Sequence, residues 1–294
     1  MRIASSSIAA ALFALATCSG AAQAQTSAQP AAPPAPSPDV GMSGNRVTLA
    51  LGVASLPDYE GADDNQITPG AAAIGTLGGY DFFTRGTNLY VDLVKDEGGP
   101  GTHFELGPVA GVRLQRNNLN AIDDRQVRAL GKIDTAYNLG ASVGVSHTGV
   151  ITSEYDTITA RVAYVGDVSG GAGSYVVTPQ INYTTPLSIR TLVSLGASAD
   201  YVGKGYGRTY FGVTPTGTLA SGLRSYDIGD SGFKSYNISF FALQSLSGDL
   251  RRGLGIGAGV LYGRLLGKYK DSPLVSDVGS ASQWAGAIGL TYTF

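Results

Sequence analysis

The sequence predicts an all-β protein, namely a transmembrane antiparallel up-and-down β-barrel of about twelve strands. Three observations lead to this fold class. Apolar and polar residues alternate in many short runs between residue 45 and the C-terminus. The last of these runs ends the chain on an aromatic residue, and the first residues have the features of an export signal. No later segment holds eighteen consecutive apolar residues, so a membrane-spanning helix is not expected.

The final run shows the alternation most clearly. Every second residue from 284 onward lies on one face, and that face is mainly apolar: Trp284, Gly286, Ile288, Leu290, Tyr292 and Phe294. The opposite face carries only alanine, glycine and threonine. The length of the run and its aromatic ends are typical of a strand that crosses a membrane. Tyr292 and Phe294 are therefore interpreted as the C-terminal strand signal of an outer-membrane barrel.

The N-terminal part divides into two segments. Residues 1–24 have the features of a secretory signal peptide, with Arg2 at the start and a small-residue cleavage site that ends at Ala24. Cys18, the only cysteine, lies inside this segment, so a chain cleaved after Ala24 has no disulfide and no thiolate ligand. A lipoprotein-type signal at Cys18 is the disfavoured alternative. Residues 25–44 are rich in Ala and Pro and are expected to form a flexible arm, which leaves 45–294 for the barrel.

Composition excludes several classes of function. A formal net charge of −2 argues against a nucleic-acid binder. Two histidines and no mature cysteine argue against a transition-metal site. We therefore expect no cofactor, no metal and no catalytic residue.

Each predicted strand is an alternating run that lies between clusters of Gly, Pro, Asn or Asp. The strands are predicted at residues 46–56, 67–77, 79–85, 87–94, 103–115, 134–146, 150–165, 174–184, 187–200, 233–246, 250–263 and 283–294. The third and fourth are the weakest patterns, so a ten-strand barrel is the alternative. Both numbers are even, as in single-chain bacterial barrels.

The lengths of the connections predict an orientation. If both termini are periplasmic, the connections 57–66, 116–133, 166–173, 201–232 and 264–282 lie outside the cell. Most of them are long, whereas most connections at the other end are short turns, which is the asymmetry of bacterial barrels. Residues 95–102 are the exception.

Charged residues in the strands are assigned to the lumen, because a charge on the lipid-facing side is costly. The candidate lumen charges are Arg113, Asp134, Arg161, Arg190 and Asp200. In the lumen they would line a pore, or pair with one another and close it.

Other features favour structural interpretations. The alternating glycines 253, 255, 257 and 259 lack the uneven spacing of a nucleotide-binding loop and predict a smooth inward face. His103 and Glu105 share a face and are interpreted as a polar lumen pair rather than a catalytic pair. The carboxylates near residue 60 would either hold a divalent cation between lipid phosphates or form a solvated loop, which is favoured. Arg264, Lys268 and Lys270 would meet lipid phosphates or water.

Three loop segments carry a resemblance to a known family. The first comprises Pro57, Asp58, Tyr59, Glu60 and Gly61; the second Tyr210, Phe211, Gly212, Val213, Thr214 and Pro215; the third Ser272, Pro273, Leu274 and Val275. Together with Tyr292 and Phe294, these segments resemble the MltA-interacting protein (MipA/OmpV) family of outer-membrane proteins. The resemblance runs from about Val47 to Phe294.

The resemblance implies a non-enzymatic scaffold that joins a murein lytic transglycosylase to a murein synthase at the periplasmic face. It implies outer-membrane lipid as the surroundings, a monomeric barrel and no catalytic residue. Two alternatives stay open. One is a narrow channel for small solutes, whose selectivity the lumen charges would set. The other, less favoured, is a barrel enzyme that modifies lipids.

Overall fold

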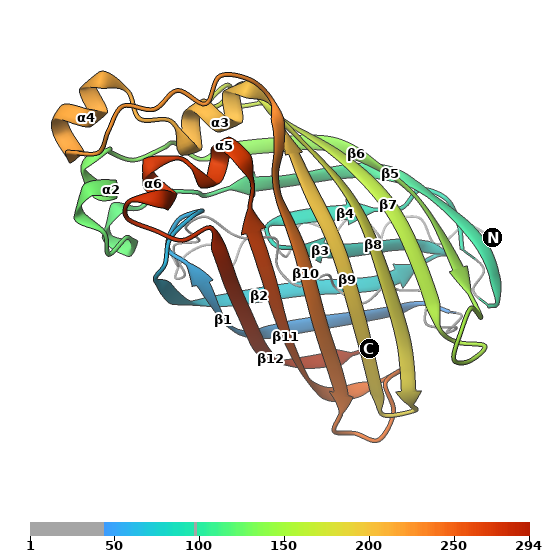
Figure 1. Ribbon diagram of the computed structural model, residues 1–294. Coiled ribbons are helices and arrows are strands. Elements are labelled where there is room, and N and C mark those ends of the chain that lie inside the picture. The colour runs from blue at the N-terminus through green and yellow to red at the C-terminus, as the bar shows by residue number, and fades with distance from the viewer. Residues whose placement is uncertain (1–43, 97–98) are drawn as a thin grey trace, which may run out of the picture.

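The computed structural model describes residues 44–96 and 99–294; the predicted signal peptide and nearly all of the predicted arm lie outside the described residues. Twelve strands form a closed antiparallel barrel, in which every strand pairs with its neighbours in the chain and β12 pairs with β1 (Figure 1). The predicted fold class and the number of twelve strands are confirmed. The ten-strand alternative is wrong.

The strands agree with the predicted runs to within a few residues, with one larger difference. They are β1 Arg46–Pro57, β2 Asn65–Leu77, β3 Tyr80–Arg85, β4 Asn88–Val91, β5 Gly101–Arg113, β6 Ala136–Thr148, β7 Thr157–Asp167, β8 Tyr175–Ser188, β9 Thr191–Val202, β10 Gly232–Ser245, β11 Gly253–Leu265 and β12 Ser282–Thr293. β7 begins seven residues later than the predicted start at 150, because Asp156 organises residues 150–156 into a turn. Its carboxylate accepts hydrogen bonds from the N–H groups of Val150 (2.7 Å) and Ile151 (2.8 Å).

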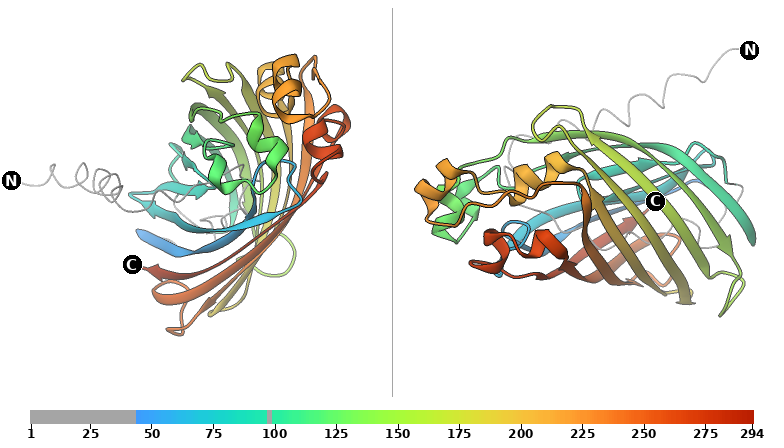
Figure 2. Two further views of the ribbon diagram at one scale, coloured as in Figure 1. Left: turned by 90° about the vertical axis from the view of Figure 1, so that its left-hand side faces the viewer. Right: turned by 45° about the horizontal axis from the view of Figure 1, so that its top comes forward.

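The two ends of the barrel differ. Short connections and both ends of the described chain lie at one end, which we call the turn end; the Phe294 N–H donates to the Val47 carbonyl there, at 2.9 Å. At the other end four connections form what we call the cap: residues 58–64, 114–135, 203–231 and 266–281. Figure 2 shows the helices gathered at the cap end, away from the C-terminus.

The cap contains short helices that the sequence analysis did not predict. They are the 3₁₀ helix η1 Leu119–Ala121 and the helices α2 Arg125–Ala129, α3 Lys204–Phe211, α4 Pro215–Ser221, α5 Gly267–Lys270 and α6 Pro273–Ser276. The boundaries of α4 have clear local causes. The Thr214 side chain caps its first turn, Pro215 occupies a first-turn position, and Gly222 ends it with a left-handed φ of 76°. None of the described helices is long and apolar enough to cross a membrane.

The outer surface of the barrel is apolar. Leu51 on β1 and Ile67 on β2 expose 70% and 71% of their surface, as expected for side chains that face lipid. Near the cap end, Tyr236, Tyr262 and Trp284 form a row of contacting rings on three neighbouring strands. Such aromatic girdles mark the membrane interface in bacterial barrels.

The inner surface has two halves. Around β6 to β9 it is polar and closely packed, as at Asn182, Thr184 and Ser194. Around β1, β2, β11 and β12 it consists of small residues, among them Ala50, Gly52, Ala72, Gly257 and Gly289. These small residues line a cavity of about 220 Å³, which we call the apolar chamber.

Candidate functional site

The cap closes one mouth of the barrel with two hydrophobic clusters. The first joins the β1–β2 connection to η1, α2 and α6, and it contains the buried residues Tyr59, Ala62, Ile122, Val127, Val213, Leu223 and Leu274. The second lies beside α3 and α5, and it contains Val202, Tyr206, Tyr210, Phe211, Ile228, Leu265, Tyr269 and Val275. Because residues from all four connections are fully or nearly fully buried here, the cap is a packed layer and not a set of independent loops.

Hydrogen bonds join the three family-motif segments within this layer. The Tyr59 hydroxyl donates to the carbonyls of Leu274 (3.0 Å) and Val278 (2.9 Å). The Ser272 hydroxyl donates to the Phe211 carbonyl at 2.6 Å. The structure therefore brings the segments 57–61, 210–215 and 272–275 together, although they are far apart in the sequence.

Gly61 shows why one motif position requires glycine. Its φ of 104° lies in the region that favours glycine, and a Cβ there would lie 2.6 Å from Cγ2 of Val275. Its N–H donates to Oε1 of Gln283 at 3.2 Å. The Gln283 amide in turn donates to the Ala62 carbonyl at 2.9 Å, so β12 holds the β1–β2 connection in place.

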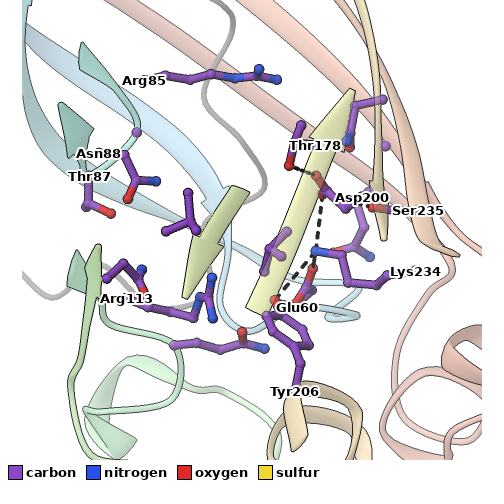
Figure 3. A pocket seen from close by; sticks show the side chains of 18 of the residues that line it. Glu60, Arg85, Thr87, Asn88, Arg113, Thr178, Asp200, Tyr206, Lys234 and Ser235 are labelled. Carbon is purple, nitrogen blue, oxygen red and sulfur yellow. Dashed lines mark hydrogen bonds and ion pairs between the residues drawn. The ribbon is translucent and has the colours of Figure 1, made fainter. Parts of the chain in front are cut away.

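A buried charge cluster lies directly beneath the cap and connects it to the barrel wall (Figure 3). Lys234 of β10 is paired with Glu60 of the cap and with Asp200 of β9, whose Oδ2 lies 3.3 Å from its Nζ. The Tyr206 hydroxyl of α3 donates to Glu60 Oε2 at 2.6 Å. The lysine is 7% exposed, and a buried ammonium requires such partners because it has lost its water. Two cap segments and two strands thus meet at Lys234.

Lys234 faces inward because the strand is irregular at this point. The pairing of β9 with β10 passes from Phe233–Tyr201 directly to Ser235–Asp200, so Lys234 is the extra residue of a β-bulge. Phe233 and Tyr236 on either side remain exposed. Sequence reasoning missed Lys234; the signal for it was a single lysine in an otherwise uncharged alternating strand.

A second ion pair lies on the lumen wall nearer the turn end, where it spans β6 at Gly144. The Arg161 guanidinium of β7 donates to Glu105 Oε2 of β5 through Nε at 2.7 Å and also through Nη2. The guanidinium also lies over the Phe83 ring, 4.6 Å from its centre. This ion pair and the ring beside it therefore fill part of the polar half of the lumen.

The cap also changes the ionisation of its own carboxylates. Asp58 is 2% exposed, and this burial raises its pKa to about 6. The Asp123 N–H donates a hydrogen bond to its Oδ2 at 3.1 Å and partly offsets this effect by lowering the pKa. Burial also raises the pKa of the Tyr59 hydroxyl. Asp63 and Asp64 are exposed. The expectation of a solvated acidic loop is therefore wrong for Asp58 and Glu60, which the cap buries.

Three of the five predicted lumen charges lie inside the barrel, and two do not. Arg113 and Asp200 line a cavity beneath the cap, and Arg161 pairs with Glu105. Asp134 precedes β6 in the cap, where it is 84% exposed and lies 3.5 Å from Lys132. Arg190 is exposed in the tight β8–β9 turn. Both assignments are corrected for the same reason, namely that these residues lie outside the strands, where alternation no longer sets the direction of a side chain.

The remaining candidates have structural partners. His103 Nδ1 lies 2.9 Å from Asp96, and His147 Nδ1 lies 2.7 Å from the Thr102 hydroxyl. Lys268 donates to the carbonyls of Asp230 and Ser231, and Arg264 to the Ser282 hydroxyl at 2.6 Å. Within the described residues, no group of three or more His, Cys, Asp or Glu side chains is placed to hold a metal ion.

Solved structures of similar shape are outer-membrane proteins. The outer-membrane channel DcaP of Acinetobacter baumannii is 10% identical with a TM-score of 0.38, and the match covers 87% of this chain and 100% of that one. The NanC porin is 11% identical with a TM-score of 0.42, covering 82% and 98%. The translocator domain of the autotransporter NalP from Neisseria meningitidis is 12% identical with a TM-score of 0.38, covering 87% and 91%. No curated protein sequence matches the chain.

The sequence itself matches a family over nearly the whole barrel. The family is described as "MltA-interacting protein MipA", and its profile covers residues 49–294. This range includes all three motif segments, the buried charge cluster and the terminal strand. The chain therefore belongs to the MltA-interacting protein MipA family, as an outer-membrane β-barrel.

Proposed function

We propose that this protein is a non-enzymatic scaffold that organises murein-remodelling enzymes at the periplasmic face of the outer membrane. The closed mouth carries this proposal. The cap clusters and the Lys234 cluster fill the end of the barrel where a solute would have to enter or leave. A barrel that is closed in this way has its turn end free for contacts, and short turns lie on the periplasmic side in bacterial barrels.

The turn end offers a surface for such contacts. Three successive turns expose large apolar side chains, which we call the turn patch: Val150, Ile151, Tyr155, Leu187, Ile189 and Leu246. Ile151 and Ile189 are each 72% exposed. The turns support one another, since the Leu250 N–H donates to the Ile189 carbonyl at 2.9 Å. Contiguous exposed apolar side chains are typical of a protein–protein contact or a membrane contact. The family description names MltA as an interaction partner, and a lytic transglycosylase and a murein synthase are the partners we propose.

A pull-down from solubilised envelopes tests the scaffold. The wild-type protein is expected to recover a murein hydrolase or synthase, and the double substitution I151D/I189D is expected to lose it. Leu219→Asp is the matched control, because Leu219 is 89% exposed on α4 at the opposite end. Recovery of no murein enzyme, or equal recovery by all three proteins, would refute the proposal.

A second candidate function is a channel that conducts only when the cap opens. The observation in its favour is that space remains below the cap: a polar cavity of about 130 Å³ beside the apolar chamber of about 220 Å³. Planar-bilayer recording separates the two candidates. A scaffold remains silent in both the wild type and a variant whose cap is loosened at Lys234, whereas a gated channel conducts in the variant.

A further inference from the structure

The polar cavity beneath the cap contains more positive than negative charge. This cavity, which we call the polar chamber, lies between the β3–β4 hairpin, β5, β9 and β10. Its walls include the cations Arg85, Arg113 and Lys234 and the anions Glu60 and Asp200. A fourth cation, Arg264, also borders the chamber, but its side chain is exposed and donates to the Ser282 hydroxyl. Without it, three cations and two anions give a charge of +1 when all are ionised.

The two carboxylates already have partners. Both are paired with Lys234, and Glu60 also accepts a hydrogen bond from Tyr206. Asp200 accepts further hydrogen bonds from the hydroxyls of Thr178 (2.8 Å) and Ser235 (3.2 Å). The Lys234 cluster is therefore electrically and geometrically complete on its own side of the chamber.

Neither of the two arginines on the other side forms an ion pair with a carboxylate of the described residues; Asp200 attracts Arg85, and Glu60 attracts Arg113, only from a longer distance. Arg85 is 7% exposed; its Nη2 donates to the Ser198 hydroxyl at 3.2 Å, and its buried Nε has no hydrogen-bond acceptor. Arg113 lies over the rings of Tyr206 and Tyr210, with its Cζ 4.7 Å and 5.7 Å from their centres. Figure 3 shows both side chains extending into the space across from Lys234 and Asp200.

A buried guanidinium that is not directly paired with a carboxylate is costly. A planar carboxylate can accept two parallel hydrogen bonds from the N–H donors of a guanidinium. The excess of a single positive charge favours a singly charged anion. The size of the chamber limits this anion: an engineered protein cavity of about 150 Å³ takes one benzene molecule. A chamber of about 130 Å³ therefore accommodates an anion of about six non-hydrogen atoms.

Two amide groups add a further requirement. Asn88 and Asn138 line the chamber, and the side-chain oxygen of each is buried without a hydrogen-bond donor. A carboxylate alone has nothing to donate to them, whereas a carboxylate that carries a hydroxyl does. We propose that the polar chamber binds a compact hydroxy-carboxylate anion, with its carboxylate on Arg85 and its hydroxyl toward Asn88 or Asn138.

The architecture offers this ligand a route from the turn end. The cap blocks direct entry from the other side, but Gly86 at the tip of the β3–β4 hairpin lines both the polar and the apolar chamber. The two cavities are therefore neighbours at the hairpin. Below that point, small residues such as Ala50, Ala72 and Gly257 line the apolar chamber, so few side chains stand between the turn end and the hairpin.

Isothermal titration calorimetry of the full barrel in detergent tests this site with three matched probes. Lactate has both the charge and the hydroxyl, propionate lacks the hydroxyl, and lactamide lacks the charge. We expect saturable binding of one lactate per barrel, weaker binding of propionate and no measurable binding of lactamide. If lactate binds no more tightly than lactamide, the chamber is not an anion site. If lactate binds no more tightly than propionate, the two amides do not have the role assigned to them.

Substitutions locate the site. Arg85→Gln removes the charge-assisted hydrogen bonds from the guanidinium to the lactate carboxylate. Loss of such bonds typically lowers affinity by roughly tenfold to a hundredfold, and we expect lactate to bind more weakly by that factor. Arg85→Lys keeps the charge but not the fork, and its expected loss is smaller. Arg128→Gln, on the exposed surface of α2, is the control and should bind as the wild type does. Heat-modifiable gel mobility verifies that each barrel is folded, and unchanged affinity in a folded R85Q barrel refutes the proposal.

Discussion

Replacing Lys234 with Met is the most direct test of the idea that a buried charge cluster holds the cap on the barrel. The substitution keeps most of the side-chain volume but removes the only cation that lies between Glu60 and Asp200 among the described residues. At the 3.3 Å separation of Nζ and Asp200 Oδ2, Coulomb's law with an effective dielectric constant of about 20 gives an attraction of about 5 kcal/mol. The desolvation of the lysine offsets part of this attraction.

The substitution also leaves two buried carboxylates that repel each other. Breaking a buried ion pair by removing one partner typically costs about 3–5 kcal/mol, which is the loss we expect for the closed cap. By contrast, Lys132→Met removes an exposed pair with Asp134, in which the lysine is 68% exposed, and should cost less than about 1 kcal/mol.

Limited proteolysis and hydrogen exchange of the cap provide the measurement, because both report local opening of the cap segments without unfolding of the barrel. Each 1.4 kcal/mol corresponds to a factor of about ten, so a loss of 3 kcal/mol increases opening, and with it cleavage within residues 203–231, by roughly a hundredfold. Glu60→Gln combined with Lys234→Met should restore part of the protection, since it removes one of the unpaired charges. A K234M cap that is cleaved no faster than the K132M cap would show that the cluster does not hold the cap.

Three other predictions address the cap and the barrel seam. Burial raises the Asp58 pKa from 3.8 to about 6, so the protonated carboxyl is favoured in the folded state. The cap is therefore expected to lose up to about 3 kcal/mol of stability as the pH rises from 4 through 6. Asp58→Asn should abolish this pH dependence of the melting temperature. Phe211→Ala, at a side chain with 0% exposure in the second cluster, should destabilise the cap by about 3–5 kcal/mol in the same proteolysis assay, and a loss below about 1 kcal/mol would contradict the packing. Gly52→Ala places a Cβ 2.2 Å from the Ile288 carbonyl oxygen at the β1–β12 seam and should lower the melting temperature of the barrel. The control is Gly70→Ala, opposite Gly52 on β2, where a Cβ has nothing within 4 Å and the melting temperature should not change. Equal melting temperatures of the two variants would count against the seam geometry.

The terminal strand and the buried charge cluster differ in how well the sequence predicts them. The side chains from Trp284 to Phe294 alternate strictly, because the barrel wall separates lipid from lumen at every residue and a strand has a period of two. Most strand boundaries follow from this period. Outside the strands this argument no longer applies. The lumen assignment of Asp134 and Arg190 assumes that both residues lie within strands, whereas both lie beyond the strand ends.

The cap helices were missed for a related reason. α3, α5 and α6 are between four and eight residues long and have little stability on their own. They form because Tyr206, Phe211, Tyr269 and Val275 pack on one another, and these residues are distant in sequence. The sequence predicts that the motif segments lie in external loops, but no local pattern indicates that those loops share one core.

The sequence by itself therefore determined the class of the protein: the membrane-spanning strands, their order and the family. These properties follow from local periodicity and from motifs that can be read residue by residue. Only the tertiary structure decided between ten and twelve strands and showed that the mouth is closed. It also showed that Glu60, Tyr206, Asp200 and Lys234 meet, and that Arg85 and Arg113 line the same chamber without an ion pair of their own. The physical reason is that closure depends on a β-bulge at Lys234 and on contacts between segments more than a hundred residues apart, as between Glu60 and Tyr206, whose sequence separation is 146.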